Sequence, residues 1–449
     1  MASRRAVVVG ASMAGLTAAK VLADRVDEVT IVERDVLPAE PADRKGVPQG
    51  RHAHGLLPSG EQVLRDLFPG IMEDLEAGGA QRTSTSSAKW WQFGGYRVDV
   101  PEFTGMFFSR CFLENTVRKR VLGVPGVSLV SAGAQGLVVE GGRARGVVIE
   151  EDGQSRQIPA DVVVDASGRG CQAARWLEAA GYPIPEVAQV TVDMAYATRL
   201  YRRTPGRLPD DTWMITIGDP DRCPRFGVAF PIEGRRWIVT LAGVHGDRAP
   251  TDDDGYLQYA ETLPTGDVAD VIRNEETLSP IVTHRLPSNQ WRHFEKLNRH
   301  LPGFLAIGDA ICSFNPIYGQ GMSSAALQSI ALRSSIEAVG IDSPSLADRF
   351  YKAAAKVIAN PWAIAAGADF VFPQTTGSKP PMVDRINGYV KRVIIAAQYD
   401  PVVARAMWEV QGLLAPPPSL MKPQMMVRVL RAARKGPRGL PASAVAAPV

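Results

Sequence analysis

A segment near residue 310 combines residue types that can hold a flat, negatively charged ligand. It predicts a short buried strand, an acidic turn at Gly308-Asp309, a loop that begins at Pro316, and a helix that begins near Gly321. A carboxylate at a strand end can accept hydrogen bonds from sugar-like hydroxyl groups, and the Gly-rich loop brings bare backbone close to the ligand. The first N–H groups of the helix favour negative charge. A reduced, anionic flavin fits this arrangement best, and an ordinary strand–turn–helix is the alternative.

A second nucleotide-binding pattern lies at the N-terminus. An apolar run at residues 6–9 predicts a buried parallel strand, which leads into Gly10-Ala-Ser-Met-Ala-Gly15, a helix, and a second strand that ends at Glu33. The first glycine permits a tight turn, the last allows close helix–strand packing, and Glu33 can bind the ribose of an adenosine. Ser12 stands where this pattern usually has glycine, and its hydroxyl can donate to a pyrophosphate. NAD would fit this half alone, whereas the segment near residue 310 favours FAD.

Two further segments agree with this interpretation. Residues 157–168 predict a strand that ends in Asp165-Ala-Ser-Gly168, and the stretches before it alternate around Gly-rich turns like a β-meander. Together the segments resemble the motifs of FAD-dependent monooxygenases related to p-hydroxybenzoate hydroxylase. The Gly-Gln-Gly-Met322 sequence is most similar to polyether epoxidases and other flavin monooxygenases of antibiotic biosynthesis. Asp165 can equally be a plain turn residue, and Arg110, which matches the start of a family helix, can equally face solvent.

The resemblance covers roughly residues 5–345 and implies a mixed α/β fold. We expect a glutathione-reductase-like FAD-binding Rossmann domain with a β-meander, an antiparallel β-sheet substrate domain and a helical C-terminal region. The expected FAD-binding domain comprises 1–85, 105–185 and 290–345, and the substrate domain comprises 86–104 and 186–289. Residues 346–435 are expected to be helical, with a helix opened by Asn360-Pro361, and 436–449 to form a disordered tail.

The loop 43–55 follows the second strand and is rich in basic residues. In the resembled family the loop in this place crosses the FAD, which implies that Arg44 and Arg51 contact it and that His54 lies near the ring. Pro316, from the segment near residue 310, is expected as a second neighbour of the ring. His52 and His54 could suggest a metal, but no third ligand cluster accompanies them, so we predict no metal site. The residues expected to bind FAD are Gly10, Ser12, Met13, Ala14, Gly15, Glu33, Arg34, Arg44, Arg51, Arg110, Ala134, Asp165, Gly308, Asp309, Gly319, Gly321 and Met322.

The region from about 186 to 285 predicts β-strands with partial alternation of apolar and polar residues. We expect it to carry an apolar pocket over the flavin for a greasy, extended or polycyclic substrate. No histidine–carboxylate pair or nucleophile–base constellation is evident, and the family's flavin chemistry requires none. Each aromatic residue can also be simple core. The expected pocket residues are Trp213, Phe226, Phe230 and Tyr318, with Trp90, Trp91 and Phe93 as further candidates.

Composition excludes several classes of protein. The chain has 449 residues, a net charge of +3 and no basic stripe interleaved with aromatic residues, so nucleic-acid binding is not expected. Four dispersed cysteines without a Cys-x-x-Cys pair predict free thiols in the cytoplasm and argue against a disulfide reductase. We expect neither a signal peptide nor a membrane span. The basic amphipathic stretch 421–435 predicts a helix that docks on the protein itself, with membrane or partner contact as the alternative.

The predicted function is that of an FAD-dependent monooxygenase. The resemblance implies that one oxygen atom of O2 passes through a flavin C4a-hydroperoxide to an apolar natural product, by epoxidation of an alkene or hydroxylation of an electron-rich ring. Electrons would come from NAD(P)H or from a partner flavin reductase, and no second Gly-x-Gly-x-x-Gly suggests a nicotinamide domain. The alternatives are a prenyl-chain or alkene reductase of the same fold, a flavin halogenase and a non-catalytic FAD-binding module. A flavin halogenase should contain a Trp-x-Trp-x-Ile-Pro segment, and this chain has none.

Overall fold

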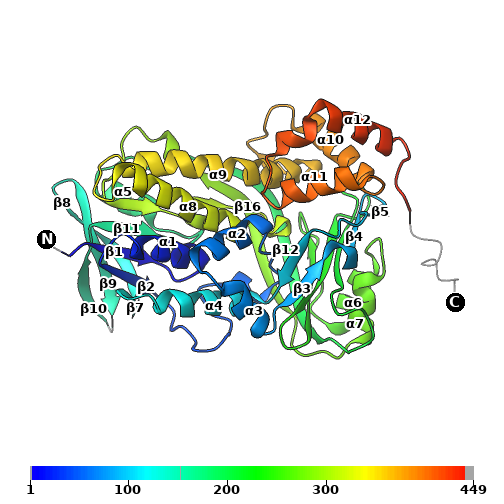
Figure 1. The fold of residues 1–449 in the computed structure, drawn as a ribbon, viewed down its shortest axis with the longest axis horizontal. Helices are drawn as coiled ribbons and strands as arrows, with labels where there is room; N and C mark the ends of the chain where they lie inside the picture. Colours follow the sequence, from blue (N-terminus) through cyan, green and yellow to red (C-terminus); the bar gives the residue numbers. More distant parts are fainter. Residues whose placement is uncertain (1–2, 152, 440–449) are drawn as a thin grey trace.

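The computed structural model describes residues 3–151 and 153–439. A parallel sheet lies in the half of the molecule that contains the N-terminus (Figure 1). Its five strands follow the order β17-β11-β1-β2-β7, and all neighbours are parallel. Four of the strands are short apolar runs that are mostly buried, as two-sided burial in a parallel sheet requires, whereas the edge strand β7 is only partly buried. They are β1 (Arg5–Val9), β2 (Glu28–Glu33), β7 (Val127–Ser131), β11 (Val162–Asp165) and β17 (Phe304–Ala306).

Helices and a small antiparallel sheet cover this parallel sheet. Figure 1 shows α1 (Met13–Ala23) with α8 (Gly321–Val339) and α9 (Leu346–Ala368) stacked beside it. The Thr17 hydroxyl of α1 lies 2.8 Å from the Ser329 hydroxyl of α8. The predicted meander is present as β8 (Gly133–Glu140), β9 (Arg143–Glu151) and β10 (Gln154–Pro159), and it packs on β1, β2 and β11. The remaining helices of this half are α2 (Pro58–Leu67), α3 (Ile71–Ala77), α4 (Arg110–Leu122) and α5 (Ala173–Ala179).

A nine-stranded sheet dominates the other half. Its main order is β18-β16-β12-β15-β14-β13-β4-β5, with β19 on β12. It is antiparallel as predicted, except that β4 runs parallel to β13. One face packs on α6 (Asp253–Glu261) and α7 (Asp267–Asn274). The strands are β4 (Ala88–Gln92), β5 (Gly95–Tyr96), β12 (Val187–Arg202), β13 (Trp213–Ile217), β14 (Arg225–Ile232), β15 (Arg236–Gly243), β16 (Val282–Arg292), β18 (Cys312–Ser313) and β19 (Thr376–Gly377); a separate pair is β3 (Gln81–Ser84) with β6 (Thr104–Phe107).

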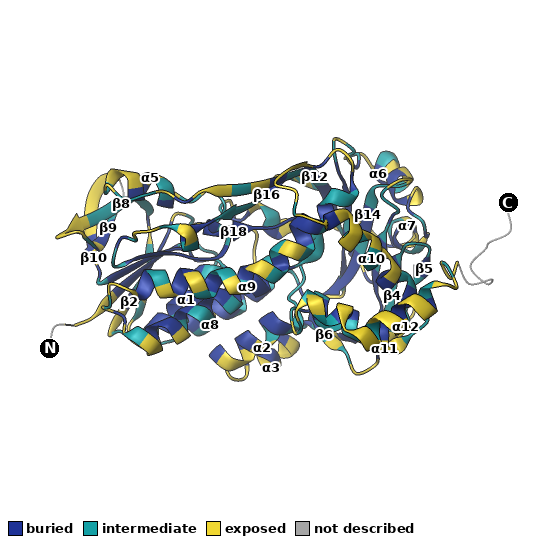
Figure 2. Ribbon diagram, turned by 90° about the horizontal axis from the view of Figure 1, so that it is seen from above, coloured by how far each residue is buried: buried dark blue, intermediate teal, exposed yellow. Residues whose placement is uncertain are grey.

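The C-terminal region is helical, as predicted, and has its own apolar core. It consists of α10 (Val383–Ala396), α11 (Pro401–Gln411) and α12 (Pro423–Ala433), grouped beside β4 and β5 in Figure 1. The basic helix α12 docks on the protein through Val429 and Ala432, and its outer side is exposed in Figure 2. No helix within the described residues is long and apolar enough to cross a membrane. Residues 436–439 of the expected tail hydrogen-bond to the protein at Gly94 and Gln398, and 440–449 lie outside the described residues.

Candidate functional site

The nucleotide-binding segments meet at the carboxyl ends of the parallel strands. Gly10 has a φ of 107°, a conformation that side chains disfavour. A Cβ atom on Gly15 would lie 1.8 Å from the carbonyl oxygen of Gly10, so both glycines are needed for α1 to begin here. A Cβ on Gly308 would lie 2.5 Å from the Cβ of Ala14. The acidic turn near residue 308 therefore packs directly on the start of α1, and the two halves of the predicted site are adjacent.

A buried charge network joins three of the predicted segments. Glu33 accepts a hydrogen bond from the N–H of Ala11 at 2.8 Å and pairs with Arg44 at 3.1 Å. Arg44 also binds Glu114 of α4 at 2.7 Å. Burial opposes the charge on Arg44, but the nearby carboxylates of Glu114 and Glu33 outweigh it and raise its pKa. The Nη2 atom of Arg44 is buried and has no hydrogen-bond partner within the described residues.

Arg110 extends this network toward the second flavin segment. It donates to the Ser12 hydroxyl at 2.6 Å and to Glu114 at 2.9 Å, and its other nitrogen lies 3.1 Å from the sulfur of Met322. Burial lowers the pKa of Arg110, and Glu114 opposes that shift. Arg110 is only 5% exposed, so the alternative of a solvent-facing arginine is wrong. It instead links the Gly10–Gly15 loop to the start of α8.

Several predicted FAD residues lie elsewhere. Arg34 and Arg51 are exposed, and Arg51 approaches Asp43 at 3.6 Å, so the structure does not bring them to the network. Ala134 lies in strand β8 of the meander, paired with β9. Asp165 is fully buried, and its Oδ1 atom accepts hydrogen bonds from the N–H (2.9 Å) and hydroxyl (2.5 Å) of Ser167. The Oδ1 atom of Asp165 thus holds the turn at Ser167, whereas its Oδ2 atom is buried and has no hydrogen-bond partner within the described residues.

The loop that precedes α8 lies opposite the loop 52–57. Gly319 has a φ of 65°, and a Cβ there would lie 4.0 Å from the Cα of Gly55. The Leu57 N–H donates to the Ser323 hydroxyl of α8 at 2.9 Å. Cβ atoms on Gly55 and Gly321 would meet nothing within 4 Å. These two glycines therefore face open space between the loops, beside the uncapped N-terminus of α8.

Asp309 lies at the centre of several basic groups. Burial raises its pKa, while Arg110, Arg169 and Arg292 oppose that shift. Its carboxylate accepts no hydrogen bond from any residue that the structure describes. The side chain is thus held in a positive environment with its oxygens available to a ligand.

A second acidic residue, Asp369, was not identified from the sequence. It is fully buried at the end of α9, and its carboxylate accepts hydrogen bonds from Asn289 (2.7 Å), Asn315 (2.9 Å) and the Tyr318 hydroxyl (3.1 Å). Burial raises the pKa of Asp369 to about 6. The backbone N–H of Asn315 also donates to Asn289 at 2.6 Å. This cluster fixes the Pro316 loop, and Tyr318 serves there as a hydrogen-bond donor.

The inner face of the nine-stranded sheet is aromatic and divided into two parts. Trp213 and Phe230 share one cluster with Phe107, whose ring centroid lies 4.6 Å from that of Phe230. Phe226 lies further along β14, in a second cluster with Phe372. Among the further candidates, Trp90 joins the first cluster. Trp91 instead packs on Tyr96, and Phe93 packs among the C-terminal helices, so these two do not belong to the expected pocket.

A polar strip separates the two aromatic clusters. The Nδ1 atom of His52 lies 2.7 Å from the Thr198 hydroxyl, which lies 2.6 Å from the Thr240 hydroxyl. His54 donates from Nδ1 to the backbone carbonyl of His52 at 2.9 Å. Burial lowers the pKa of His52 to about 3 and that of His54 to about 4. Both imidazoles are therefore neutral near pH 7. The Thr198–Thr240 contact depends on strand register, which no local sequence signal marks.

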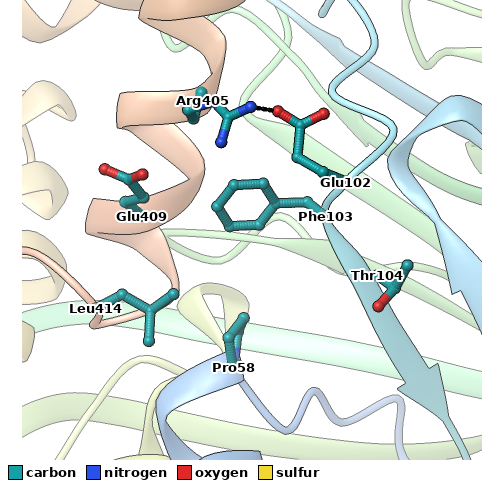
Figure 3. Close-up of a pocket in the computed structure, with 7 residues that line it drawn as sticks. All are labelled: Pro58, Glu102, Phe103, Thr104, Arg405, Glu409 and Leu414. Carbon is teal, nitrogen blue, oxygen red and sulfur yellow. Dashed lines mark ion pairs between the residues drawn. The ribbon is translucent and has the colours of Figure 1, made fainter.

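A cavity of about 440 Å³ opens at the surface between α2, α11 and the loop before β6 (Figure 3). An ion pair between Arg405 and Glu102 lies at its rim. None of the predicted site residues lines it. Its lining residues are Pro58, Glu102, Phe103, Thr104, Arg405, Glu409 and Leu414. This cavity therefore lies apart from the network at the strand ends.

We compared the sequence and the fold with those of known proteins. No protein-family model matches the chain. The chain is 33% identical over 419 residues to Protein Rv3254 of Mycobacterium tuberculosis, a match that covers 89% of this chain and 87% of that protein. Its structure is similar to that of the flavin-dependent brominase Bmp2, with a TM-score of 0.68, 15% identity, and coverage of 96% of this chain and 98% of that chain.

A second solved structure is also similar. It is p-nitrophenol 4-monooxygenase PnpA from Pseudomonas putida DLL-E4, with a TM-score of 0.61, 15% identity, and coverage of 92% of this chain and 98% of that chain. The predicted fold is thereby confirmed. The chain belongs to the family of Protein Rv3254, and its fold is that of the FAD-dependent aromatic hydroxylases and the flavin-dependent halogenases.

Proposed function

We propose that this protein is an FAD-dependent monooxygenase. It inserts one oxygen atom from O2 into an apolar natural-product substrate, as an epoxide at an alkene or as a hydroxyl on an electron-rich ring. The observation that carries the proposal is that flavin-type motifs and an aromatic sheet face meet at one place. Ala53, from the loop 52–57, packs against the cluster of Trp213 and Phe230, and Ile317, from the loop before α8, packs against the cluster of Phe226.

The residues at the strand ends fit FAD. Open space beside Gly55 and Gly321 and the available carboxylate of Asp309 provide room and acceptors for a ligand. We assign Glu33 to the adenosine ribose. The other assignments are Ser12 and Arg110 to the pyrophosphate, Asp309 to the ribitol hydroxyls, and the first N–H groups of α8 to the pyrimidine edge of the flavin. Bound and reduced, FAD would supply the activation of O2 and the transfer of one oxygen atom.

The chain's own side chains would exclude water and stabilise charge. Trp213, Phe230 and Phe226 line an apolar face, and excluding water suppresses the wasteful release of H2O2. The N-terminus of α8 favours negative charge near it. Because His54 donates from Nδ1, its Nε2 atom is a hydrogen-bond acceptor that can bind a substrate hydroxyl.

The comparisons support a flavin-dependent oxygenase or a flavin-dependent halogenase. PnpA is a monooxygenase by name, and PqsL, a further structural neighbour, is described in complex with 2-aminobenzoylacetate. The likeness to Bmp2 keeps a halogenase as the second candidate, although the chain has no Trp-x-Trp-x-Ile-Pro segment. A prenyl or alkene reductase is the third. We further propose NAD(P)H or a partner flavin reductase as the electron source, and a cytoplasmic location, since all four cysteines are free thiols.

Isotope labelling tests the proposal. The purified holoenzyme, supplied with NADH, NADPH or a flavin reductase, is incubated with a panel of polyenes and phenols under 18O2. One 18O atom is expected in the product, with a lower release of H2O2 when substrate is present. Turnover in the strict absence of O2 would contradict the proposal in favour of a reductase. A brominated product that forms only when bromide is added would favour a halogenase.

A further inference from the structure

A half-buried arginine, Arg97, lies at the end of the aromatic cluster that contains Trp90 and Trp408, and its Nη2 atom is fully buried. Arg97 follows β5, and its backbone N–H donates to the carbonyl oxygen of Trp90 at 3.0 Å. Its guanidinium carbon lies 4.1 Å from the ring centroid of Trp90 and 4.4 Å from that of Trp408 on α11. The Nη1 atom donates to Gln411 at 2.9 Å. Two indole rings and one amide therefore fix the position of this cation.

The charge of Arg97 has no carboxylate partner within the described part of the chain. Burial alone lowers its pKa to about 9, and no neighbouring acid opposes that shift. Arg110, which is more deeply buried, contrasts with it because Arg110 pairs with Glu114 at 2.9 Å. A buried charge that lacks a counter-ion destabilises a protein unless a ligand supplies one. Arg97 stays protonated near pH 7 and so offers a positive charge.

Unpaired hydrogen-bond donors surround this charge. The Nη2 atom of Arg97 and the indole Nε1 atoms of Trp90 and Trp408 are all buried and have no partner among the described residues. The rings of Trp90 and Trp408 are 4.9 Å apart, so these donors lie in one small region. Each of these three groups can only donate. A ligand that satisfies them must therefore bring acceptor atoms.

The aromatic cluster around Trp213 connects the surroundings of Arg97 with the loop 52–57, which lies beside the flavin motifs. Trp213 lies 6.0 Å from Trp90 and 5.9 Å from Trp408, measured between ring centroids. Trp213 also lies 5.3 Å from Phe107, and Ala53 packs on the same cluster. A ligand bound at Arg97 can therefore extend along aromatic side chains toward the loop 52–57. Because several aromatic rings in series lie between Arg97 and this loop, an elongated ligand fits better than a compact one.

We propose that Arg97, with the indole N–H groups of Trp90 and Trp408, binds the carboxylate of an extended unsaturated or aromatic substrate acid. The apolar body of that acid lies along Trp213 toward the flavin. A carboxylate fits better than a phosphate monoester, because one guanidinium compensates one charge and a phosphate carries nearly two. This assignment defines the substrate class of the monooxygenase and rests on the proposed function only for the oxygenation step.

Binding of matched acid and ester probes tests the proposal without turnover. The probes are farnesoate and 2-naphthoate, each compared with its methyl ester, and binding to the holoenzyme is followed by calorimetry and tryptophan fluorescence. At least one acid is expected to bind about ten- to a hundredfold more tightly than its ester, since a charge-assisted hydrogen bond contributes that much. Equal or tighter binding of both esters would overturn the proposal.

Variants test whether the preference for the acid depends on Arg97. Arg97→Gln is expected to abolish the preference for the acid while ester affinity changes little, and Arg97→Lys is expected to restore part of it. Arg405→Gln is the matched control, because it removes an exposed positive charge from the same helix as Trp408 and should leave the preference intact. A preference that survives in folded Arg97→Gln would overturn the assignment. Preferential binding of the acid without 18O incorporation would contradict only the proposal of a monooxygenase. Incorporation of 18O without a preference for the acid would contradict only the proposal of a carboxylate site at Arg97.

Discussion

Asp369 offers a sharp test of how the loop before α8 is held. Asp369→Ala removes the acceptor of three hydrogen bonds from Asn289, Asn315 and Tyr318. An unsatisfied buried donor costs about 2 kcal/mol, so three such donors cost about 6 kcal/mol. Removing the buried carboxylate relieves about 3 kcal/mol, because its pKa is raised from 3.8 to about 6. We therefore expect a net loss of about 3 kcal/mol in the free energy of unfolding.

The assay combines urea unfolding with titration of FAD into the apoprotein. Asp369→Ala is expected to unfold at lower urea concentration and to bind FAD more weakly, because the loop at Pro316 loses its anchor. Asp384→Ala is the control, since Asp384 is exposed and pairs with Lys379 at 2.8 Å. An Asp369→Ala variant with the stability and FAD affinity of the wild type would refute the reasoning.

The pH dependence of the same residue has a definite sign. The pKa of Asp369 is about 6 in the folded protein and near 3.8 when unfolded, so the folded state binds the proton more tightly. Its destabilising contribution is therefore absent below about pH 4, grows between about pH 4 and 6, and is complete above that range. Relative to Asp369→Asn, the wild type should gain up to about 3 kcal/mol as the pH falls from 7 to 4. A difference that does not change with pH would contradict this assignment.

Two further predictions concern FAD binding. Glu33→Gln is expected to weaken FAD binding about ten- to a hundredfold while FMN binding changes little, because Glu33 is assigned to the adenosine ribose; unchanged FAD affinity, measured by flavin fluorescence, would remove Glu33 from the site. Asp309→Ala is expected to lose FAD or to hold it displaced, whereas Met322→Leu, which nearly conserves volume, should keep the flavin spectrum. Full flavin content and turnover in Asp309→Ala would show that the assignment of the segment near residue 310 is wrong.

Local patterns were sufficient for much of the architecture. Apolar runs such as residues 6–9 predict buried parallel strands because both faces must be apolar, and the structure confirms them. Gly15 is needed because a Cβ atom there would meet the carbonyl oxygen of Gly10, only five residues away, whereas a Cβ atom on Gly10 would meet the distant carbonyl oxygen of Ala166. The meander followed in the same way from alternation and Gly-rich turns such as Gly141-Gly142, where both residues have positive φ.

Other features depend on contacts that no local pattern reports. Asn360-Pro361 was expected to open a helix, but Pro361 lies inside α9, where Trp362 packs 5.6 Å from Trp291. Tertiary packing there overrides the usual effect of proline on a helix. The predicted group of aromatic residues was also divided, because strand register directs Trp90 to the inner face and its neighbour Trp91 to Tyr96.

The sequence by itself determined the class of fold and the segments that could bind a dinucleotide, since turn conformation and strand burial are short-range properties. Only the tertiary structure decided which distant side chains meet. Arg110 joins Ser12 to Met322, and Asp369 holds Asn315, because strands far apart in sequence lie side by side in the sheets. Arg97 becomes a candidate anion site only when α11 places Trp408 against it. The physical reason is that charge and hydrogen-bond satisfaction depend on distance in space, which the order of residues does not specify.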